Sequence, residues 1–359
     1  FTWDTTQLET TYIRDSSADM YANADSADAS KGAGLSGTLP ESGKSKRKVL
    51  ETDDGLVRFQ GQIKSSSKLL NLRINNTWAF IDENGIYDIT LPVKKGKSDV
   101  SLTVNDPSGA ASQIKYAVVS AQDGQLEMPV GRRVALLIGV EEYDNAIPEL
   151  DTPVQDISDV AERLQSVQNF EVERMENPTK MEVINRLKTL ATELNQNDTL
   201  MVYYAGHGQL IKETGRGYWL PRDAEPDDPK NWISNRDIAR LFHRTPTKQI
   251  LMVADSCYSG AFIGSGTRVT NIGVSDLDLT PRAVMGMSSG GEQPVWDGGA
   301  EGNSIFASKL LETVGQGTIE GKALHKQVKN RVIIVAPQVP GYGAMLMPGY
   351  DDGADFVLK

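Results

Sequence analysis

The fold is decided by the stretch Leu200-Met201-Val202-Tyr203-Tyr204-Ala205-Gly206-His207-Gly208, an apolar run that ends abruptly in glycines and a histidine. A second run, Ile250-Leu251-Met252-Val253-Ala254-Asp255-Ser256-Cys257, ends in polar residues and the only cysteine of the chain. Continuous apolar runs of this kind are typical of strands that are buried on both faces of a parallel sheet. Active sites of open α/β sheets lie at the carboxyl ends of the strands, so both run ends are candidate sites.

Outward from these two runs, predicted strands and helices alternate along the chain. Further apolar runs predict strands at 134–140, 172–175 and 283–287, and helical spacing predicts helices at 154–167, 179–194, 233–243, 304–314 and 322–335. This alternation predicts a three-layer α/β domain with a mostly parallel central sheet and helices on both faces. We place this domain at residues 130–359.

The N-terminal third of the chain has a different pattern. Residues 1–47 are rich in Ser, Ala, Asp, Gly and Thr, and they bury little apolar surface, so we expect an extended or partly disordered segment. Residues 48–125 contain short alternating runs between turn signals, which predict a small all-β sandwich. With Asn75, the run 82–87 and Gly96, this stretch resembles bacterial immunoglobulin-like modules. We interpret it as a spacer or packing module, with a protein-binding role as the alternative.

Composition excludes several classes of protein. The chain has 37 basic and 48 acidic residues, a net charge of −11, which argues against a general nucleic-acid binder. It contains no apolar run of about 18 residues, so no membrane span is predicted. One cysteine and three histidines exclude an intramolecular disulfide and a Cys-rich zinc site. Because the chain begins at Phe1 and not at Met, we expect that the true N-terminus is missing or was processed away, and the compartment stays open between cytoplasm and export.

The cysteine and one histidine follow matching strand ends. His207 and Cys257 lie fifty residues apart, and their side chains emerge together if the two strands are neighbours. A deprotonated thiol is a strong nucleophile, and an imidazole accepts its proton near neutral pH. Alone, the cysteine would be a small buried hydrophobe and the histidine a turn residue, but together they favour catalysis. The backbone amides of Gly208 and Cys257 are the donors expected for an oxyanion. The sequence assigns no third residue that orients His207.

The motifs 203–208 and Asp255-Ser256-Cys257-Tyr258-Ser259-Gly260 resemble the His and Cys motifs of caspase-fold cysteine peptidases (peptidase family C14). In caspases the histidine lies about 50 residues before the cysteine. The Asp-x-Cys-x-Ser-Gly form departs from the Gln-Ala-Cys-x-Gly of animal caspases and is similar to metacaspases and bacterial caspase-like peptidases. The resemblance covers residues 130–358. It implies a caspase-type fold and a cysteine endopeptidase acting on proteins or peptides.

The same resemblance implies a substrate preference. In the metacaspase-like branch, the acid two residues before the cysteine lines the S1 pocket, and Asp255 stands there in this chain. A second pocket acid lies on the first helix of the domain, where Asp156 has the matching place. Two carboxylates favour Arg or Lys at P1, and Arg can bind them bidentately. The plainer interpretations are a strand-end turn residue for Asp255 and an exposed helix acid for Asp156.

Caspase-fold enzymes are often cut between their two halves, and residues 260–282 occupy that place here. We expect self-cleavage after Arg268, with Arg282, Arg47 and Lys48 as further candidates. Many metacaspases need Ca²⁺, which takes six to eight oxygen ligands. The segment 209–218 carries only one acidic residue, so we expect no metal site, no Ca²⁺ dependence and no other cofactor.

Two alternatives remain open. One is a catalytically silent scaffold or sensor that keeps the fold and acts through protein–protein contacts. The other is a thiol hydrolase of another kind, such as an amidase, which an acidic S1 pocket disfavours. The natural substrate and the activation trigger are not predicted.

Overall fold

The structure is a computed structural model of the 359-residue chain. It describes residues 7–13, 48–64, 71–75, 77–82, 84–105, 111–125, 131–257, 260, 263, 282–290, 302–345, 349–351 and 353–358. The chain forms two compact units, with the first running to Met128 and the second beginning at Pro129. Each unit is considered separately below.

The N-terminal unit is made of two sheets that share one core. One sheet is antiparallel, with the order β1-β3-β6, and contains β1 (Gln7–Ile13), β3 (Leu56–Lys64) and β6 (Ile86–Pro92). The other has the order β2-β8-β7-β4-β5, and its strands are β2 (Lys48–Thr52), β4 (Asn71–Ile74), β5 (Thr77–Ala79), β7 (Gly96–Asn105) and β8 (Ala111–Ser120). Only its β2–β8 pair is parallel.

Alternate residues of these strands point into the shared core. Phe59 of β3, Leu72 of β4 and Tyr116 of β8 are among its members, and each is 3 % exposed or less. This alternation is the two-residue period by which a strand buries one face. The strands expected between 48 and 125 are therefore present, whereas the immunoglobulin-like assignment stays an interpretation.

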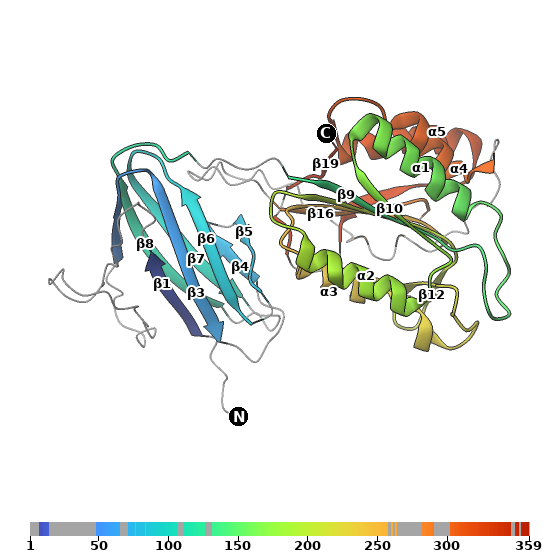
Figure 1. Ribbon diagram of the computed structural model, residues 1–359, viewed down its shortest axis with the longest axis horizontal. Coiled ribbons are helices and arrows are strands. Elements are labelled where there is room, and N and C mark those ends of the chain that lie inside the picture. Colours follow the sequence, from blue (N-terminus) through green and yellow to red (C-terminus); the bar gives the residue numbers. More distant parts are fainter. Residues whose placement is uncertain are drawn as a thin grey trace. The chain divides into compact units, whose positions relative to one another are not determined.

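The second unit is built around a six-stranded sheet with the order β10-β9-β11-β15-β16-β18 (Figure 1). Its strands are β9 (Arg133–Gly139), β10 (Glu171–Glu176), β11 (Thr199–Ala205), β15 (Gln249–Asp255), β16 (Ala283–Ser288) and β18 (Gly341–Ala344). All neighbouring pairs are parallel except β16–β18. The prediction of a mostly parallel central sheet is confirmed.

Helices cover both faces of this sheet. On one face lie α1 (Pro153–Gln168), α4 (Ile305–Thr313) and α5 (Gly321–Val335), and on the other lie α2 (Lys180–Glu193) and α3 (Asn235–His243) (Figure 1). Along β11 the side chains alternate between the two cores, so Tyr203 packs with the first group of helices and Tyr204 with the second. The three-layer arrangement predicted from the alternation of strands and helices is therefore present.

Short elements complete the second unit. A small antiparallel sheet is formed by β12 (Gly208–Ile211), β13 (Arg216–Trp219) and β14 (Ile233–Ser234), and a 3₁₀ helix, η1, spans Pro229–Asn231. Near the C-terminus, β17 (Ile319–Glu320) pairs with β19 (Val357–Leu358). In the part of the chain that the structure describes, no helix is both long and apolar enough to cross a membrane.

Arg282 is a structural residue, which corrects its prediction as a cleavage site. It is 1 % exposed and directly precedes β16. Its guanidinium donates to the carbonyl oxygens of Phe242, Thr245, Thr247 and Gly349. A peptidase needs an accessible, extended segment, and Arg282 offers none in the folded chain. Of the other candidates, Arg268 and Arg47 lie outside the described residues, and Lys48 is the first residue of β2.

Candidate active site

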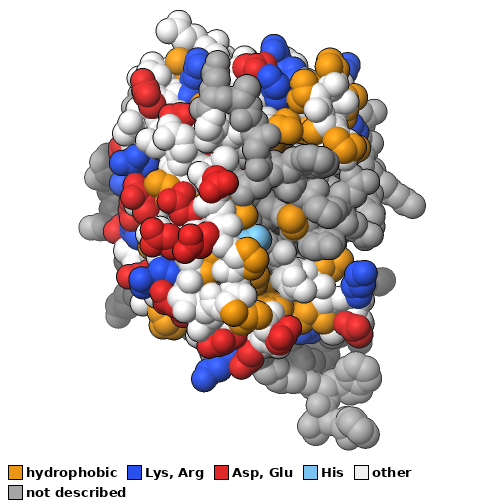
Figure 2. Space-filling view, turned by 90° about the vertical axis from the view of Figure 1, so that its right-hand side faces the viewer, with side chains coloured by type: hydrophobic (Ala, Val, Ile, Leu, Met, Phe, Trp, Pro, Cys, Tyr) orange, Lys and Arg blue, Asp and Glu red, His pale blue; other side chains and the backbone are white. Residues whose placement is uncertain are grey.

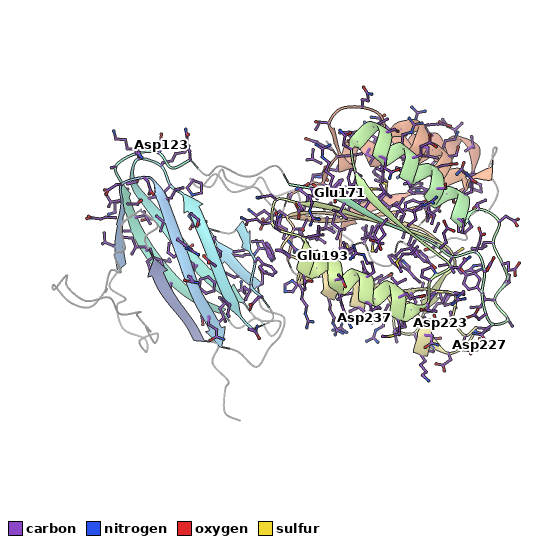
Figure 3. All side chains as sticks on the ribbon, in the orientation of Figure 1. Asp123, Glu171, Glu193, Asp223, Asp227 and Asp237 are labelled. Carbon is purple, nitrogen blue, oxygen red and sulfur yellow. The ribbon has the colours of Figure 1, made fainter. Side chains whose placement is uncertain are left out.

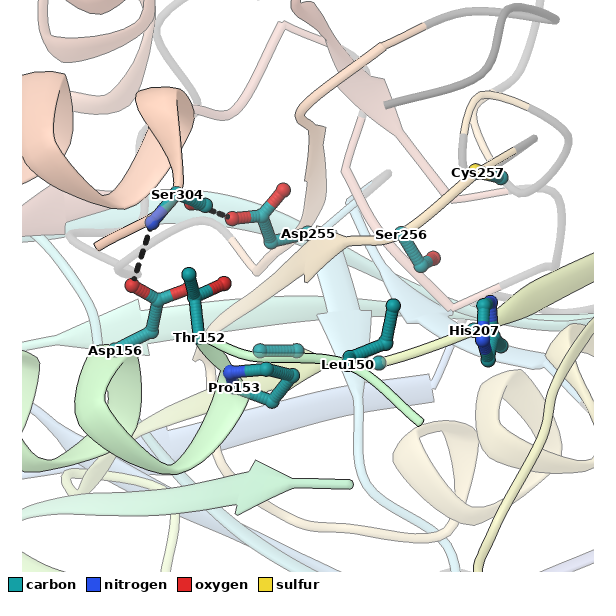
Figure 4. Close-up of a pocket in the computed structure, with 11 residues that line it drawn as sticks. Leu150, Thr152, Pro153, Asp156, His207, Asp255, Ser256, Cys257 and Ser304 are labelled. Atoms are coloured by element: carbon teal, nitrogen blue, oxygen red, sulfur yellow. Dashed lines mark hydrogen bonds between the residues drawn. The ribbon is translucent and has the colours of Figure 1, made fainter. Parts of the chain in front are cut away.

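The strand register brings the predicted histidine and cysteine to the same edge of the sheet. Strand β11 pairs in parallel with β15, and Ala205 lies opposite Asp255 at their last position. His207 and Cys257 each follow two residues later, and both side chains are partly buried. Figure 4 shows them at the same end of a pocket. The expectation that the two side chains emerge side by side from neighbouring strands therefore agrees with the topology.

The backbone of His207 is fixed on both sides. Its amide donates to the Tyr143 hydroxyl at 2.9 Å. Its carbonyl oxygen accepts from the Tyr204 hydroxyl at 2.7 Å and from the Leu220 amide at 3.0 Å. The Tyr143 ring also packs on the imidazole, with ring centroids 5.2 Å apart. These contacts fix the backbone from which the imidazole extends.

The imidazole of His207 has a defined hydrogen-bond partner. Its Nε2 lies 2.8 Å from the carbonyl oxygen of Pro148. A carbonyl oxygen only accepts hydrogen bonds, so Nε2 carries the hydrogen and Nδ1 is the basic nitrogen of the neutral ring. The contact holds the imidazole through a backbone carbonyl that the sequence did not assign.

Gly208 comes very close to the cysteine. A Cβ atom on Gly208 would lie 2.3 Å from the carbonyl oxygen of Cys257, so only glycine allows this approach. Gly208 pairs with Trp219 in the β12–β13 ladder, while the flanking Leu220 amide bonds to His207. In an antiparallel ladder this pattern makes Gly208 and Trp219 a non-hydrogen-bonded pair. The Gly208 amide therefore points away from β13, as an oxyanion donor requires.

Two carboxyl groups lie at the other end of the pocket, whose volume is about 90 Å³. Asp156 comes from α1 and Asp255 from the end of β15, and they are 1 % and 5 % exposed. Ser304 lies between them: its amide donates to Asp156 Oδ1 at 2.9 Å, and its hydroxyl donates to Asp255 Oδ2 (Figure 4). Asn303 donates to the same Asp156 oxygen at 3.1 Å. The interpretation of Asp156 as an exposed helix acid is therefore wrong.

The described lining of the pocket is acidic. Its described lining residues include no Lys or Arg; they are Leu150, Thr152, Pro153, Asp156, Ala205, Gly206, His207, Asp255, Ser256, Cys257 and Ser304. Burial, and then the charge of Asp255, raise the pKa of Asp156 to about 7, against opposing hydrogen bonds from Ser304 and Asn303.

The sequence did not identify three contributors to this site. Tyr143 and Pro148 lie in the loop before α1, and Pro148 contributes only a backbone carbonyl, which no side-chain pattern reveals. Ser304 carried one signal, because a serine just before a helix predicts an N-cap. It is the N-cap of α4 and accepts from the Ala307 amide. Its second role, between two carboxylates, depends on the tertiary structure.

Comparisons with known proteins agree with this domain. The family model of the caspase domain (Peptidase_C14) matches residues 132–348. Two similar solved structures are protein GSU0716 of Geobacter sulfurreducens and caspase-1 of Spodoptera frugiperda. Each is 18 % identical in sequence to this chain, with a TM-score of 0.45. Each match covers 62 % of this chain, and it covers 97 % of the Geobacter protein and 92 % of the Spodoptera caspase. No curated protein has significant similarity to the chain.

Proposed function

Because the chain belongs to the caspase domain family, and its second unit has the caspase fold, we propose that it is a cysteine endopeptidase that cleaves after Arg or Lys. The observation that carries the proposal is the pocket. A thiol and an imidazole lie at one end, and two buried carboxyl groups, those of Asp156 and Asp255, lie at the other. In this proposal Cys257 and His207 carry out the reaction, and Asp156 and Asp255 select the P1 side chain of the substrate.

The proposed reaction starts at Cys257. Nδ1 of His207 accepts the thiol proton, and the thiolate attacks the carbonyl carbon of the scissile bond. The amides of Gly208 and Cys257 donate to the oxyanion that forms. His207 then gives its proton to the leaving amine, which departs and leaves an acyl-enzyme. Water, deprotonated by the same imidazole, attacks the thioester, releases the carboxylate product and restores the thiol.

The S1 preference follows from the charge of the pocket. A P1 Arg would place its guanidinium against Asp156 and Asp255, where charge-assisted hydrogen bonds form in a site that excludes most water. The loop before α1 adds further negative charge, since residues 141–151 contain five acidic residues and no Lys or Arg. Figure 2 shows acidic side chains gathered beside an exposed histidine on one face of the molecule. Such a surface would steer basic substrates toward the site.

The deciding experiment is a peptide library that varies only P1, digested in parallel by the wild type and by Cys257→Ala. We expect cleavage after Arg and Lys by the wild type, and none by Cys257→Ala. Faster turnover of a P1 Asp peptide than of the matched Arg peptide would reject the specificity. Since the chain has one cysteine, loss of activity on alkylation must arise at Cys257.

Self-processing and metal independence are further parts of the proposal. We expect cleavage between 260 and 282, after Arg268, seen by mass spectrometry in the wild type and absent from Cys257→Ala. We also expect activity to survive EGTA, because acidic side chains after the histidine already accept protein hydrogen bonds. Asp223 bonds to the Lys180 amide, Asp228 to the Lys230 amide and Asp237 to the Ser234 hydroxyl. Figure 3 shows Asp223 and Asp237 on the same side of the sheet as α2.

The alternative function is that of a catalytically silent scaffold or sensor. It predicts no turnover of any library peptide, although a basic peptide could still bind the acidic pocket. The N-terminal sandwich would be the natural candidate for protein contacts in either case. A pull-down with the sandwich mutated on its exposed faces, in the full chain, would test that role.

A further inference from the structure

We propose that Ser304 positions Asp156 and Asp255 as one proton-binding unit, so that a cationic P1 side chain enters the pocket in exchange for a proton. This inference rests on the proposed function for the place of the P1 side chain. It adds a positioning residue, and it couples substrate binding to pH. Neither follows from the presence of two acidic residues alone.

The first argument is the geometry of Ser304. This residue uses its amide for Asp156 and its hydroxyl for Asp255. The same hydroxyl oxygen accepts from the Ala307 amide at 2.9 Å. The first turn of α4 therefore fixes the hydroxyl, and the hydroxyl proton is directed to Asp255 Oδ2. One side chain with few rotamers thus sets the relative position of two carboxyl groups from different elements.

The second argument is the charge around the pair. Asp156 Oδ2 is buried and has no hydrogen-bond partner among the described residues. Among the described residues, the groups that face the pair include Tyr203 from β11, whose hydroxyl lies 3.4 Å from Asp255 Oδ2, and the neutral Asn303 and Ser304 just before α4. Burial raises the pKa of Tyr203 well above its usual range, so it is neutral. His207 and Cys257 line the other end of the pocket.

These two arguments assign the proton. Two carboxylates that accept from the same serine do not both ionise readily, and the charge of Asp255 raises the pKa of Asp156. Ser304 donates its hydroxyl to Asp255 Oδ2, so this oxygen already has a donor. Asp156 Oδ2 has no hydrogen-bond donor among the described residues, and burial and the charge of Asp255 raise the pKa of Asp156 to about 7. At neutral pH the empty pocket therefore carries a proton on Asp156 in about half of the molecules. A guanidinium replaces that proton.

The experiment measures binding without catalysis. The full-length Cys257→Ala chain is titrated calorimetrically with a peptide containing one Arg, in buffers of different ionisation enthalpy. The control peptide has citrulline, the neutral isostere, in place of Arg. We expect the Arg peptide to release about half a proton at pH 7 and to bind about tenfold more tightly at pH 8 than at pH 6. The citrulline peptide should show neither effect.

Variants test the role of Ser304. Ser304→Ala removes the hydroxyl that donates to Asp255, so the pair of carboxyl groups should hold its proton more tightly. The pH at the midpoint of the affinity profile should therefore rise, and the Arg peptide should bind about tenfold more weakly at pH 7. Ser304→Thr keeps the hydroxyl and should restore the profile. Ser234→Ala is the matched control, because Ser234 is the N-cap of α3, a helix of the same nine-residue length as α4. It should leave the profile unchanged.

The outcomes separate the two proposals. An Arg peptide that binds without proton release and with a flat pH profile overturns the shared proton but leaves the S1 assignment intact. An Arg peptide that binds no better than citrulline at any pH overturns the S1 assignment itself. A Ser304→Ala profile that matches Ser234→Ala shows that the serine only caps its helix.

Discussion

At the scale of single residues, the site depends on close backbone approaches as much as on side chains. Gly208 follows His207 and lies against the carbonyl of Cys257, with no room for a Cβ atom. Gly208→Ala should therefore displace the cysteine loop and lower kcat/KM about 100-fold, the usual cost of losing an oxyanion donor. Gly315→Ala is the control, because that glycine has open space around its Cβ position. Equal activities of the two variants would contradict the close approach.

Asp156 should also influence stability. Its ordinary pKa of 3.8 is raised to about 7 by burial and by Asp255. Between these values the folded chain holds a proton that the unfolded chain has released, so stability falls as pH rises toward 7. We expect Tm of the wild type to fall by about 5 °C between pH 5 and pH 8. The side chain in Asp156→Asn carries no charge at any pH, so this part of the dependence of Tm on pH should be lost. If Tm depends on pH with the same slope in the wild type and in Asp156→Asn, Asp156 is not a buried, protonated carboxyl group.

The candidate site was predictable only where it depends on residue identity. His207 and Cys257 each follow an apolar run that predicts a buried strand, and this position predicted both as site residues. The resemblance to the family motif added Asp156 and Asp255. Pro148 acts through its carbonyl and Ser304 through a bridge between α1 and β15. Such roles depend on which segments lie together in space, which local sequence patterns do not encode.

At the scale of elements, the start of β16 depends on Arg282, whose guanidinium bonds to four carbonyl oxygens. Arg282→Lys keeps the positive charge but cannot satisfy all four acceptors, so we expect a loss of roughly 3 kcal/mol in the free energy of unfolding. Arg331→Lys is the control, because Arg331 pairs with Glu312 on the surface. Its effect should stay within about 0.5 kcal/mol. Denaturant titration measures both.

The same substitution tests the correction of the cleavage site. A lysine at 282 would remain a cleavable basic residue, so the positions of cleavage should stay those of the wild type. A fragment that begins at Ala283 would show that the buried bond is cut and would contradict the structural role.

The elements that the sequence predicted well are those with strong internal patterns. Strands β9, β11 and β15 are buried along nearly their whole length, and α2 has the capping box of Thr179 and Glu182 that its sequence indicated. The elements that it missed, such as β12, β13 and β18, have four residues each and include glycine. Pairing with neighbours stabilises such strands, and intrinsic propensity does not predict them.

At the scale of the whole molecule, the chain contains separate hydrophobic cores in its two units. Phe59 and its neighbours fill the N-terminal core, while the second unit has a core on each face of its sheet. Units with their own cores can unfold independently, so calorimetry of the full Cys257→Ala chain should show two transitions. An Arg peptide at 100 times its Kd should stabilise only the transition of the second unit, by about 2.7 kcal/mol.

A core substitution in the sandwich assigns the two transitions. Phe59→Leu creates a cavity in the N-terminal core. It should lower the free energy of unfolding by roughly 1–2 kcal/mol, and only for the transition that the peptide leaves unchanged. The activity of the same substitution in the wild-type background should be unaffected, because none of the described pocket residues belongs to that core. A single transition that responds to both the peptide and Phe59→Leu would mean that the two units unfold cooperatively. The N-terminal sandwich would then contribute to the stability of the second unit and not only to spacing or docking.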